Sequence, residues 1–186
     1  MRSVAVAVTS FGVLLLSAMP LLAEWTQQPK DFHGVPFGAN EEAVRKVLDP
    51  DQKKSAANCH TIQRDRMCDE SFKIGDVQVI ASYWLTDDAM RTVHVTFSGK
   101  DFAFIRSAFI ERYGDPESEM TEEWRNRAGS SYQNVVLKWR GDLVQIQLFQ
   151  RGARRDDGVA ILSYVPWLEK QVKRDSDAAK EASRKF

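Results

Sequence analysis

The sequence has no excess of charge of either sign, and it has few histidines. Lys and Arg together number 26, as do Asp and Glu, so the formal net charge is zero. Nucleic-acid binding depends on neutralising many phosphates, and a balanced chain offers no such basic surplus. The three histidines, His33, His60 and His94, are scattered along the chain. We therefore predict no nucleic-acid partner and no histidine-based metal centre.

Motifs that mark common enzyme classes are missing as well. The chain has no phosphate-cradling glycine loop, no nucleophile elbow and no helix with paired zinc-binding histidines. The sequence thus predicts no catalytic residues, no cofactor and no metal.

A long apolar run occurs at the N-terminus. Residues 1–23 have the layout of a secretory signal peptide, with Arg2, a nearly continuous apolar stretch from Val4 to Leu16, and small residues ending at Ala23. We predict cleavage after Ala23 and a periplasmic or secreted mature chain. The run approaches the ~20 residues that span a bilayer, so an uncleaved membrane anchor is the alternative. No cysteine follows it, so lipid attachment at a new N-terminus is not indicated.

Cysteine is scarce. The chain has two, Cys59 and Cys68, in the stretch NCHTIQRDRMCDE. In an oxidising compartment such a close pair is expected to form a disulfide, which would stabilise the fold by about 2–3 kcal/mol. The alternative is a metal site that also uses His60 and Asp69. Zinc sites favour cysteines separated by two to four residues, and His60 has no second histidine beside it, so the disulfide is the prediction.

Helical periodicity marks two segments before the C-terminal region. Asn40 is placed to cap a short helix that ends at Asp49-Pro50. A second helix ends at Gly114, since glycine favours the left-handed conformation that closes many helices. Its apolar face is formed by Phe102, Ile105, Phe109 and Tyr113.

Alternation of apolar and polar residues predicts six strands. They lie at Phe72 to Ile74, Val77 to Leu85, Val93 to Phe97, Asn134 to Arg140, Leu143 to Gln150 and Gly158 to Val165. The segment 117–131 is polar and is predicted to be a loop.

These elements predict an α+β fold with one antiparallel sheet. The sheet is expected to consist of two helix-plus-three-strand halves, residues 32–98 and 99–166, with the helices packed on one face. Residues 24–166 form the domain, and residues 167–186 form a charged C-terminal helix or tail.

The triplet Arg140-Gly141-Asp142, associated with cell adhesion, is interpreted as a turn. A two-residue loop at Gly141-Asp142 pairs apolar residues on one face, Trp139 with Val144 and Leu137 with Ile146. The same test at Gly75-Asp76 pairs Ile74 with Val77 and Phe72 with Val79. Glycine in the first loop position suits a type II′ turn.

The stretch GVPFGANEEAVRKVL feeds a short helix and is followed by the cysteine pair and a strand meander. In this order of elements the chain, from about Phe32 to Val165, resembles β-lactamase-inhibitor-protein-like exported domains. Small outer-membrane assembly lipoproteins have a similar helix-then-sheet unit, although this chain lacks their lipid-bearing cysteine. The resemblance implies a protein-binding module without catalytic residues. It carries over no binding-site residue.

The candidate binding residues fall in three places. On the outer face of the first meander, pairing of Ser82 with His94 places Ile80, Trp84 and His94 together, either as a half-exposed strand face or as a partner-binding patch. A Ser–His contact without an orienting acid is a poor catalytic candidate. The other two places are Trp124, in the predicted polar loop, and an arginine-rich loop that is either solvated or suited to an anionic partner. Its residues are Arg151, Arg154 and Arg155.

The sequence thus favours an exported, non-catalytic module of the cell envelope that binds a protein or a small ligand. A small envelope enzyme, a hydrolase, is one alternative. A structural accessory held to the membrane by an uncleaved N-terminus is another.

Overall fold

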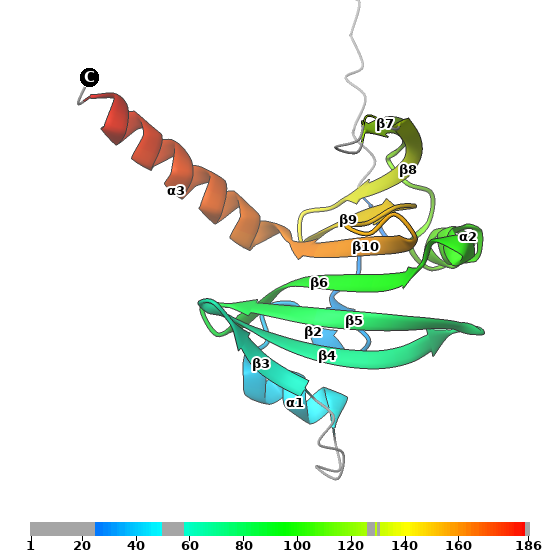
Figure 1. Ribbon diagram of the computed structural model, residues 1–186. Coiled ribbons are helices and arrows are strands. Elements are labelled where there is room, and N and C mark those ends of the chain that lie inside the picture. Colours follow the sequence, from blue (N-terminus) through cyan, green and yellow to red (C-terminus); the bar gives the residue numbers. More distant parts are fainter. Residues whose placement is uncertain (1–24, 50–57, 126–128, 130, 185–186) are drawn as a thin grey trace, which may run out of the picture.

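The computed structural model describes residues 25–49, 58–125, 129 and 131–184. Within them the chain is an α+β protein with a large antiparallel sheet and three α-helices (Figure 1). The predicted signal segment, residues 1–23 with the cleavage site at Ala23, lies outside the described residues.

Eight strands form the main sheet, in the order β3-β4-β5-β6-β10-β9-β8-β7. They are β3 (Asn58–Ile62), β4 (Asp65–Ile74), β5 (Val77–Thr86), β6 (Ala89–Ser98), β7 (Ser118–Arg125), β8 (Ser131–Arg140), β9 (Val144–Phe149) and β10 (Asp157–Tyr164). The central pair is β6 and β10, and β3 and β7 are the edges. Two short strands, β1 (Asp31–Phe32) and β2 (Val35–Pro36), pair with each other outside this sheet.

The helices begin and end where the local signals predict. Helix α1 (Glu41–Leu48) is capped by Asn40, whose side chain accepts a hydrogen bond from the Ala43 N–H at 3.0 Å. A 3₁₀ turn (Gly99–Asp101) leads into α2 (Phe102–Tyr113), after which Gly114 adopts a φ of 79°. Helix α3 (Val165–Ser183) has proline in its first turn. This helix includes nearly all of the described C-terminal segment, which was predicted to be a charged helix or tail.

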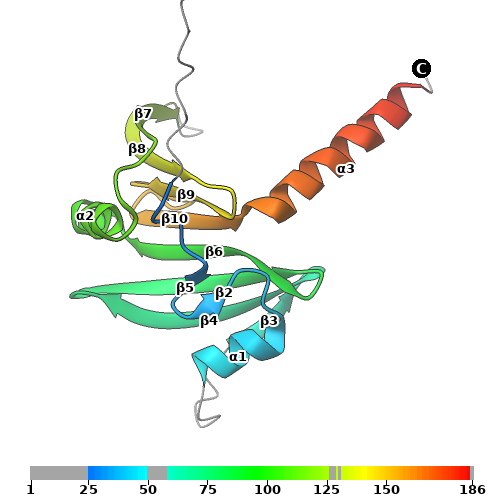
Figure 2. The same ribbon diagram turned by 180° about the vertical axis from the view of Figure 1, so that it is seen from behind.

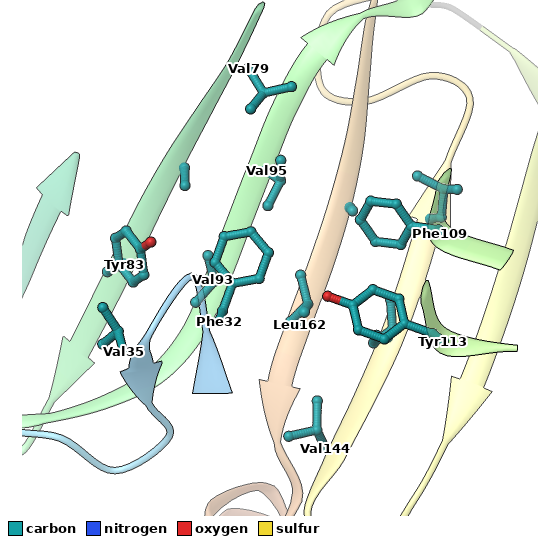
Figure 3. Packing of buried hydrophobic residues seen from close by; sticks show 14 of the residues in the cluster. Phe32, Val35, Val79, Tyr83, Val93, Val95, Phe109, Tyr113, Val144 and Leu162 are labelled. Carbon is teal, nitrogen blue, oxygen red and sulfur yellow. The ribbon is translucent and has the colours of Figure 1, made fainter. Parts of the chain in front are cut away.

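One hydrophobic cluster joins the sheet to the chain segments around it (Figure 3). Side chains at alternate positions of β5, β6, β8, β9 and β10 supply most of it, as the period of two predicts. Val44 of α1, Phe32 and Val35 of the N-terminal segment, and the apolar face of α2 complete it. Trp139 is 2% exposed and belongs to this core.

The prediction of three strands after each helix is wrong. Four strands follow α1 and four follow α2, because β3 and β7 are additional edge strands. Strand β7 occupies most of the segment predicted as a polar loop and pairs with β8 over its whole length. An edge strand pairs on one side and faces solvent with many of its side chains, so its sequence lacks the apolar alternation of a central strand.

Two of the three strand registers predicted from the sequence are present. At Gly75-Asp76 the pairs are Ile74 with Val77 and Phe72 with Val79, and Gly75 has a φ of 58°. At the β5–β6 turn Ser82 faces His94, as expected. The loop there has two residues, Asp87 and Asp88, and a bulge next to Trp84 accommodates the extra residue of β6.

The predicted two-residue turn at Gly141-Asp142 is wrong. Trp139 pairs with Ile146 and Leu137 with Leu148, so the strands are offset by two residues from the predicted register. Gly141 is not among the glycines of positive φ. The longer loop is stabilised by the N-terminal segment, because the side-chain oxygen of Gln28 accepts hydrogen bonds from the backbone N–H groups of Leu143 and Val144. A shift of two residues keeps every side chain on its face, and therefore apolar pairing alone did not exclude it.

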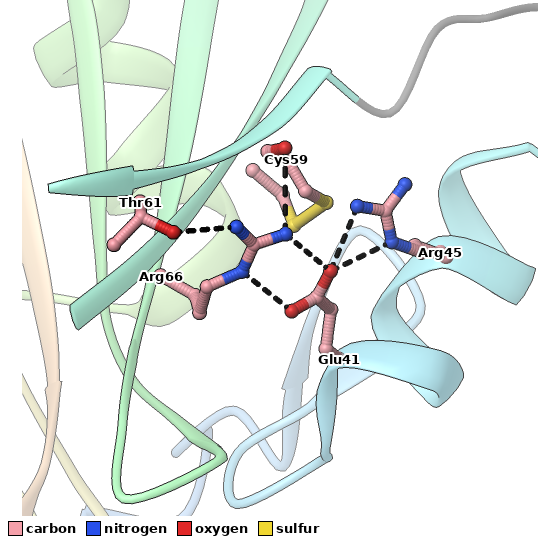
Figure 4. Close-up of polar contacts among 6 residues, drawn as sticks. Glu41, Arg45, Cys59, Thr61 and Arg66 are labelled. Carbon is pink, nitrogen blue, oxygen red and sulfur yellow. Dashed lines mark hydrogen bonds and ion pairs between the residues drawn. A yellow bond between two sulfur atoms is a disulfide. The ribbon is translucent and has the colours of Figure 1, made fainter. Parts of the chain in front are cut away.

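The predicted disulfide between Cys59 and Cys68 is present and joins directly paired residues of β3 and β4. Beside it, Arg66 of β4 donates to both carboxylate oxygens of Glu41 at 2.7 and 2.8 Å, and Arg45 donates to the same carboxylate (Figure 4). These hydrogen bonds, the one to Arg66 first, lower the pKa of Glu41 to about 2. The group ties α1 to the β3–β4 hairpin.

Helix α3 extends away from the sheet in both views (Figures 1 and 2). None of its residues is buried, and Val172 is 69% exposed. No helix among the described residues is long and apolar enough to cross a membrane.

Candidate functional site

The side of the main sheet that points away from the hydrophobic cluster is here called the open face. The β1–β2 segment lies behind the sheet in Figure 1 and in front of it in Figure 2, so Figure 1 views the molecule from the open face. Side chains reach this face from the even-numbered positions of β5, β7 and β8, from those of β6 beginning at Thr92, and from the odd-numbered positions of β4, β9 and β10.

Ile80, Trp84 and His94, the predicted patch, do lie together on the open face. Ile80 is 50% exposed, whereas Trp84 and His94 are half-buried. The indole of Trp84 lies 5.7 Å from the His94 ring, and its register neighbours are Met67 on β4 and Thr92 on β6. Its Nε1 is buried without a hydrogen-bond partner among the described residues.

Ser82 has an acidic neighbour that the sequence analysis did not place. Asp69 of β4 is its register partner, and the Ser82 hydroxyl donates to Asp69 Oδ1 at 2.6 Å. A row of Asp69, Ser82 and His94 therefore crosses three strands. The expectation that no acid lies near this pair is corrected, and the missing information was the β4–β5 register.

The order of this row does not suit nucleophilic catalysis. In a Ser–His–acid triad the histidine lies between the other two, takes the serine proton and is oriented by the acid. Here the serine lies in the middle and its proton is directed to Asp69. Burial lowers the pKa of His94, which keeps its ring neutral near pH 7. The row is a polar stripe within the sheet surface.

The other predicted residues gather at the far end of the same face. Trp124 lies on β7 opposite Tyr132 of β8, with 6.4 Å between the rings, rather than in a loop. The guanidinium groups of Arg151 and Arg155 lie 5.5 and 5.9 Å from the centroid of the Tyr132 ring. Arg154 is exposed and is not brought into this contact.

An apolar row connects the two ends of the open face. Its members are register neighbours from β5 to β7: Ile80, Thr96, Val159, Phe149, Val136 and Met120. Ile80 and Met120, near the ends, are 50% and 39% exposed, and Val136 is fully buried although it lies outside the core cluster. Thr96 is the one polar member. The row could have been recognised in the sequence, because the alternation of β9 and β10 places the apolar residues Phe149 and Val159 on the outer face.

The structure offers no other arrangement with obvious chemistry in the part it describes. No group of three or more potential metal ligands occurs among the described residues. The grooves along α3 are open, and the larger one is lined by Trp25, Tyr113, Trp139, Leu168 and Val172 among others.

Comparisons with known proteins give no family to which the chain can be assigned. No family model, no curated protein and no solved structure matches it.

Proposed function

We propose that this chain is an exported, non-catalytic module of the cell envelope that binds a folded protein partner through the open face. The observation that carries the proposal is the apolar row from Ile80 to Met120, which crosses the face of a sheet that no described helix covers. Apolar side chains that lie together on an uncovered sheet face are typical of an interaction site.

The size of the face favours a protein over a small ligand. Eight strands at ~4.8 Å spacing and strands of about 30 Å give a surface of roughly 1,000 Å². A stable protein–protein interface needs about 800 Å² on each partner. Small-molecule sites are instead concave pockets that enclose most of the ligand, and the open face has aromatic anchors without such an enclosure.

Trp84 is the proposed anchor of the interface. It is half-buried on its own strand, so part of its side chain is accessible on the open face. Tryptophan is enriched among interface residues that contribute most to binding, because it combines a large apolar area with one polar atom. Trp124, at the other end of the face, has its donor engaged by Glu122 at 3.2 Å.

Export is supported by the disulfide, because such bonds persist in oxidising compartments. The signal-like layout of residues 1–23 agrees with this, and we place the mature protein in the periplasm or outside the cell. The anchored accessory remains the competing arrangement, and N-terminal sequencing of the purified protein distinguishes the two. A mature chain beginning at Glu24 supports export, and full-length protein in washed membranes contradicts it.

The proposal includes an internal repeat. Each of α1 and α2 precedes four strands, and the order β3-β4-β5-β6 on one side of the sheet mirrors β7-β8-β9-β10 on the other. Val44 of α1 and Phe109 of α2 share one core cluster with the sheet, which supports packing of both helices on one face. A helix-then-sheet repeat agrees with the proposed likeness to β-lactamase-inhibitor-protein-like domains.

The test compares a variant of the open face with a matched control. Ile80→Lys places a charge at the exposed edge of the apolar row, and Val172→Lys makes the same kind of change at a 69% exposed position on α3. Envelope proteins captured by the mature chain are identified by mass spectrometry, and the purified candidate is titrated against each variant. We expect Ile80→Lys to weaken binding at least tenfold, and Val172→Lys to leave it unchanged.

A second variant tests the anchor itself. Trp84→Ala is expected to weaken binding by about 2 kcal/mol, as for a typical aromatic anchor, while lowering the melting temperature only slightly. Equal binding by wild type, Ile80→Lys and Trp84→Ala would contradict the proposal. A large loss of stability in Trp84→Ala would instead assign the residue a packing role.

A further inference from the structure

Tyr132, Arg151 and Arg155 form a compact group at the β7–β8 end of the open face, here called the arginine–tyrosine cluster. Both guanidinium carbons lie within 6 Å of the Tyr132 ring centroid, at 5.5 and 5.9 Å. Cations are attracted to the faces of aromatic rings at such distances. One ring therefore holds two positive charges close together.

The position of Arg151 is fixed by further contacts. Its Nε donates to the Gln133 carbonyl at 3.0 Å and its Nη1 donates to the Arg155 carbonyl at 3.1 Å. Its backbone N–H donates to Oδ1 of Asn134, a residue that is fully buried. The guanidinium is thus held in one orientation, and Nη2 remains for a ligand.

No carboxylate neutralises these arginines by direct contact in the described part of the chain. Arg151, Arg154 and Arg155 form none of the ion pairs found there, although Asp156 and Asp157 follow directly in sequence. Arg155 has its whole guanidinium available, because no hydrogen bond from it is formed with the described residues. Two like charges held beside one ring without a counter-charge are the arrangement that an anionic ligand would stabilise.

We propose that the arginine–tyrosine cluster binds a phosphate group. Guanidinium groups form paired hydrogen bonds with phosphate oxygens, and a phosphate has enough oxygens to accept from two arginines at once. Trp124 and the 39% exposed Met120 lie on the neighbouring strand and provide apolar contact for the remainder of the ligand. The ligand class is therefore a phosphorylated compound with an apolar portion, either a lipid headgroup of the envelope or a free phosphorylated molecule.

Inorganic pyrophosphate and lipid vesicles are the two probes of this site. Pyrophosphate is titrated into the mature protein by calorimetry at low ionic strength, where screening is weak. In parallel, flotation measures binding to vesicles of phosphatidylcholine with and without phosphatidylglycerol. Binding of both pyrophosphate and the phosphatidylglycerol vesicles identifies a headgroup site, and binding of pyrophosphate alone identifies a site for a free phosphorylated ligand.

The double variant Arg151→Gln with Arg155→Gln removes two charges from the cluster. Its matched control, Arg174→Gln with Lys180→Gln, removes two charges from exposed positions on α3. We expect binding to weaken at least tenfold in the first variant and less than twofold in the second. An equal loss of binding in both variants would show that only the net charge of the protein matters, and it would overturn the proposal. The proposal would also be overturned if the wild type bound neither pyrophosphate nor the vesicles.

Tyr132 provides a test that leaves every charge in place. Tyr132→Leu removes the ring that holds the two guanidiniums, and we expect about threefold weaker binding. Tyr132→Phe keeps the ring and is expected to bind like the wild type. Equal binding by the Leu and Phe variants would contradict the role of the ring. These outcomes do not depend on the protein partner, because Ile80→Lys is expected to leave phosphate binding intact.

Discussion

The two edges of the sheet are built from similar parts but are fastened differently. At each edge an Arg–Glu pair connects a strand to a helix, Arg66 with Glu41 at the β3–β4 edge and Arg106 with Glu119 at the β7 edge. The first edge also has the disulfide, and its carboxylate binds two arginines (Figure 4). The second pair is single and more exposed, with side chains 37% and 40% accessible.

This difference teaches that pairing in the same sheet does not imply equal local stability. The β3 strand has five residues and little apolar surface, so covalent and ionic contacts replace the packing it lacks. Strand β7 is longer, with eight residues, and its backbone pairing with β8 extends along all of them. The free energy needed to open one edge of the sheet depends on the contacts made at that edge. We therefore expect the loss of one contact to change local stability by different amounts at the two edges.

The largest effect is expected from removing the disulfide. The double variant Cys59→Ala with Cys68→Ala should lower the free energy of unfolding by about 2–3 kcal/mol, because the bond limits the unfolded chain. Calorimetry measures the loss, and hydrogen exchange locates it. Exchange should accelerate in β3 and remain unchanged in β7. Faster exchange at both edges would break the comparison.

A smaller, pH-dependent effect is expected from Glu41→Gln. A carboxylate whose pKa is lowered on folding stabilises the protein above its unfolded pKa of about 4.5. That contribution is lost as the pH falls through the folded pKa of about 2. The variant should be less stable than wild type by about 1 kcal/mol at pH 7, since the contact is partly exposed. The difference should shrink between pH 4.5 and pH 2 in urea titrations, and a constant difference would assign the loss to packing.

The smallest effect is expected from Arg106→Gln at the opposite edge. An exposed ion pair contributes a few tenths of a kcal/mol and is weakened by salt. The variant should therefore unfold within about 0.5 kcal/mol of the wild type at neutral pH, and the gap should close in 1 M salt. A loss as large as that of Glu41→Gln would show that the two edges are fastened alike.

The central part of the fold could be predicted from the sequence. Alternation in β5, in β9 and in β6 beyond its bulge assigns each side chain to a face, and the cap at Asn40 and the glycine at Gly114 mark helix ends. The disulfide was predicted from the expected oxidising compartment and from the short separation of Cys59 and Cys68 in the sequence. These signals are local, since a few neighbouring residues carry each one.

The rest depends on contacts that local patterns do not encode. Strand β7 is polar because it lies at an edge, and the β8–β9 register is set with help from Gln28, which is distant in sequence. Asp69 reaches Ser82, and Arg151 reaches Tyr132, through pairing of strands whose order was not predicted. The sequence could name individual candidate residues, but which of them lie together depends on the strand order of the sheet.

The position of β10 has a consequence for how the chain folds. It is the last strand in sequence, yet it lies in the middle of the sheet between β6 and β9. A chain that is synthesised from its N-terminus can complete β3 to β6 early, but one side of β6 stays unpaired until β10 is available. Such contacts between distant segments are slow to form, and the waiting strand edge is prone to wrong pairing. A chaperone that protects unpaired strands would therefore act on this protein between the arrival of β6 and that of β10.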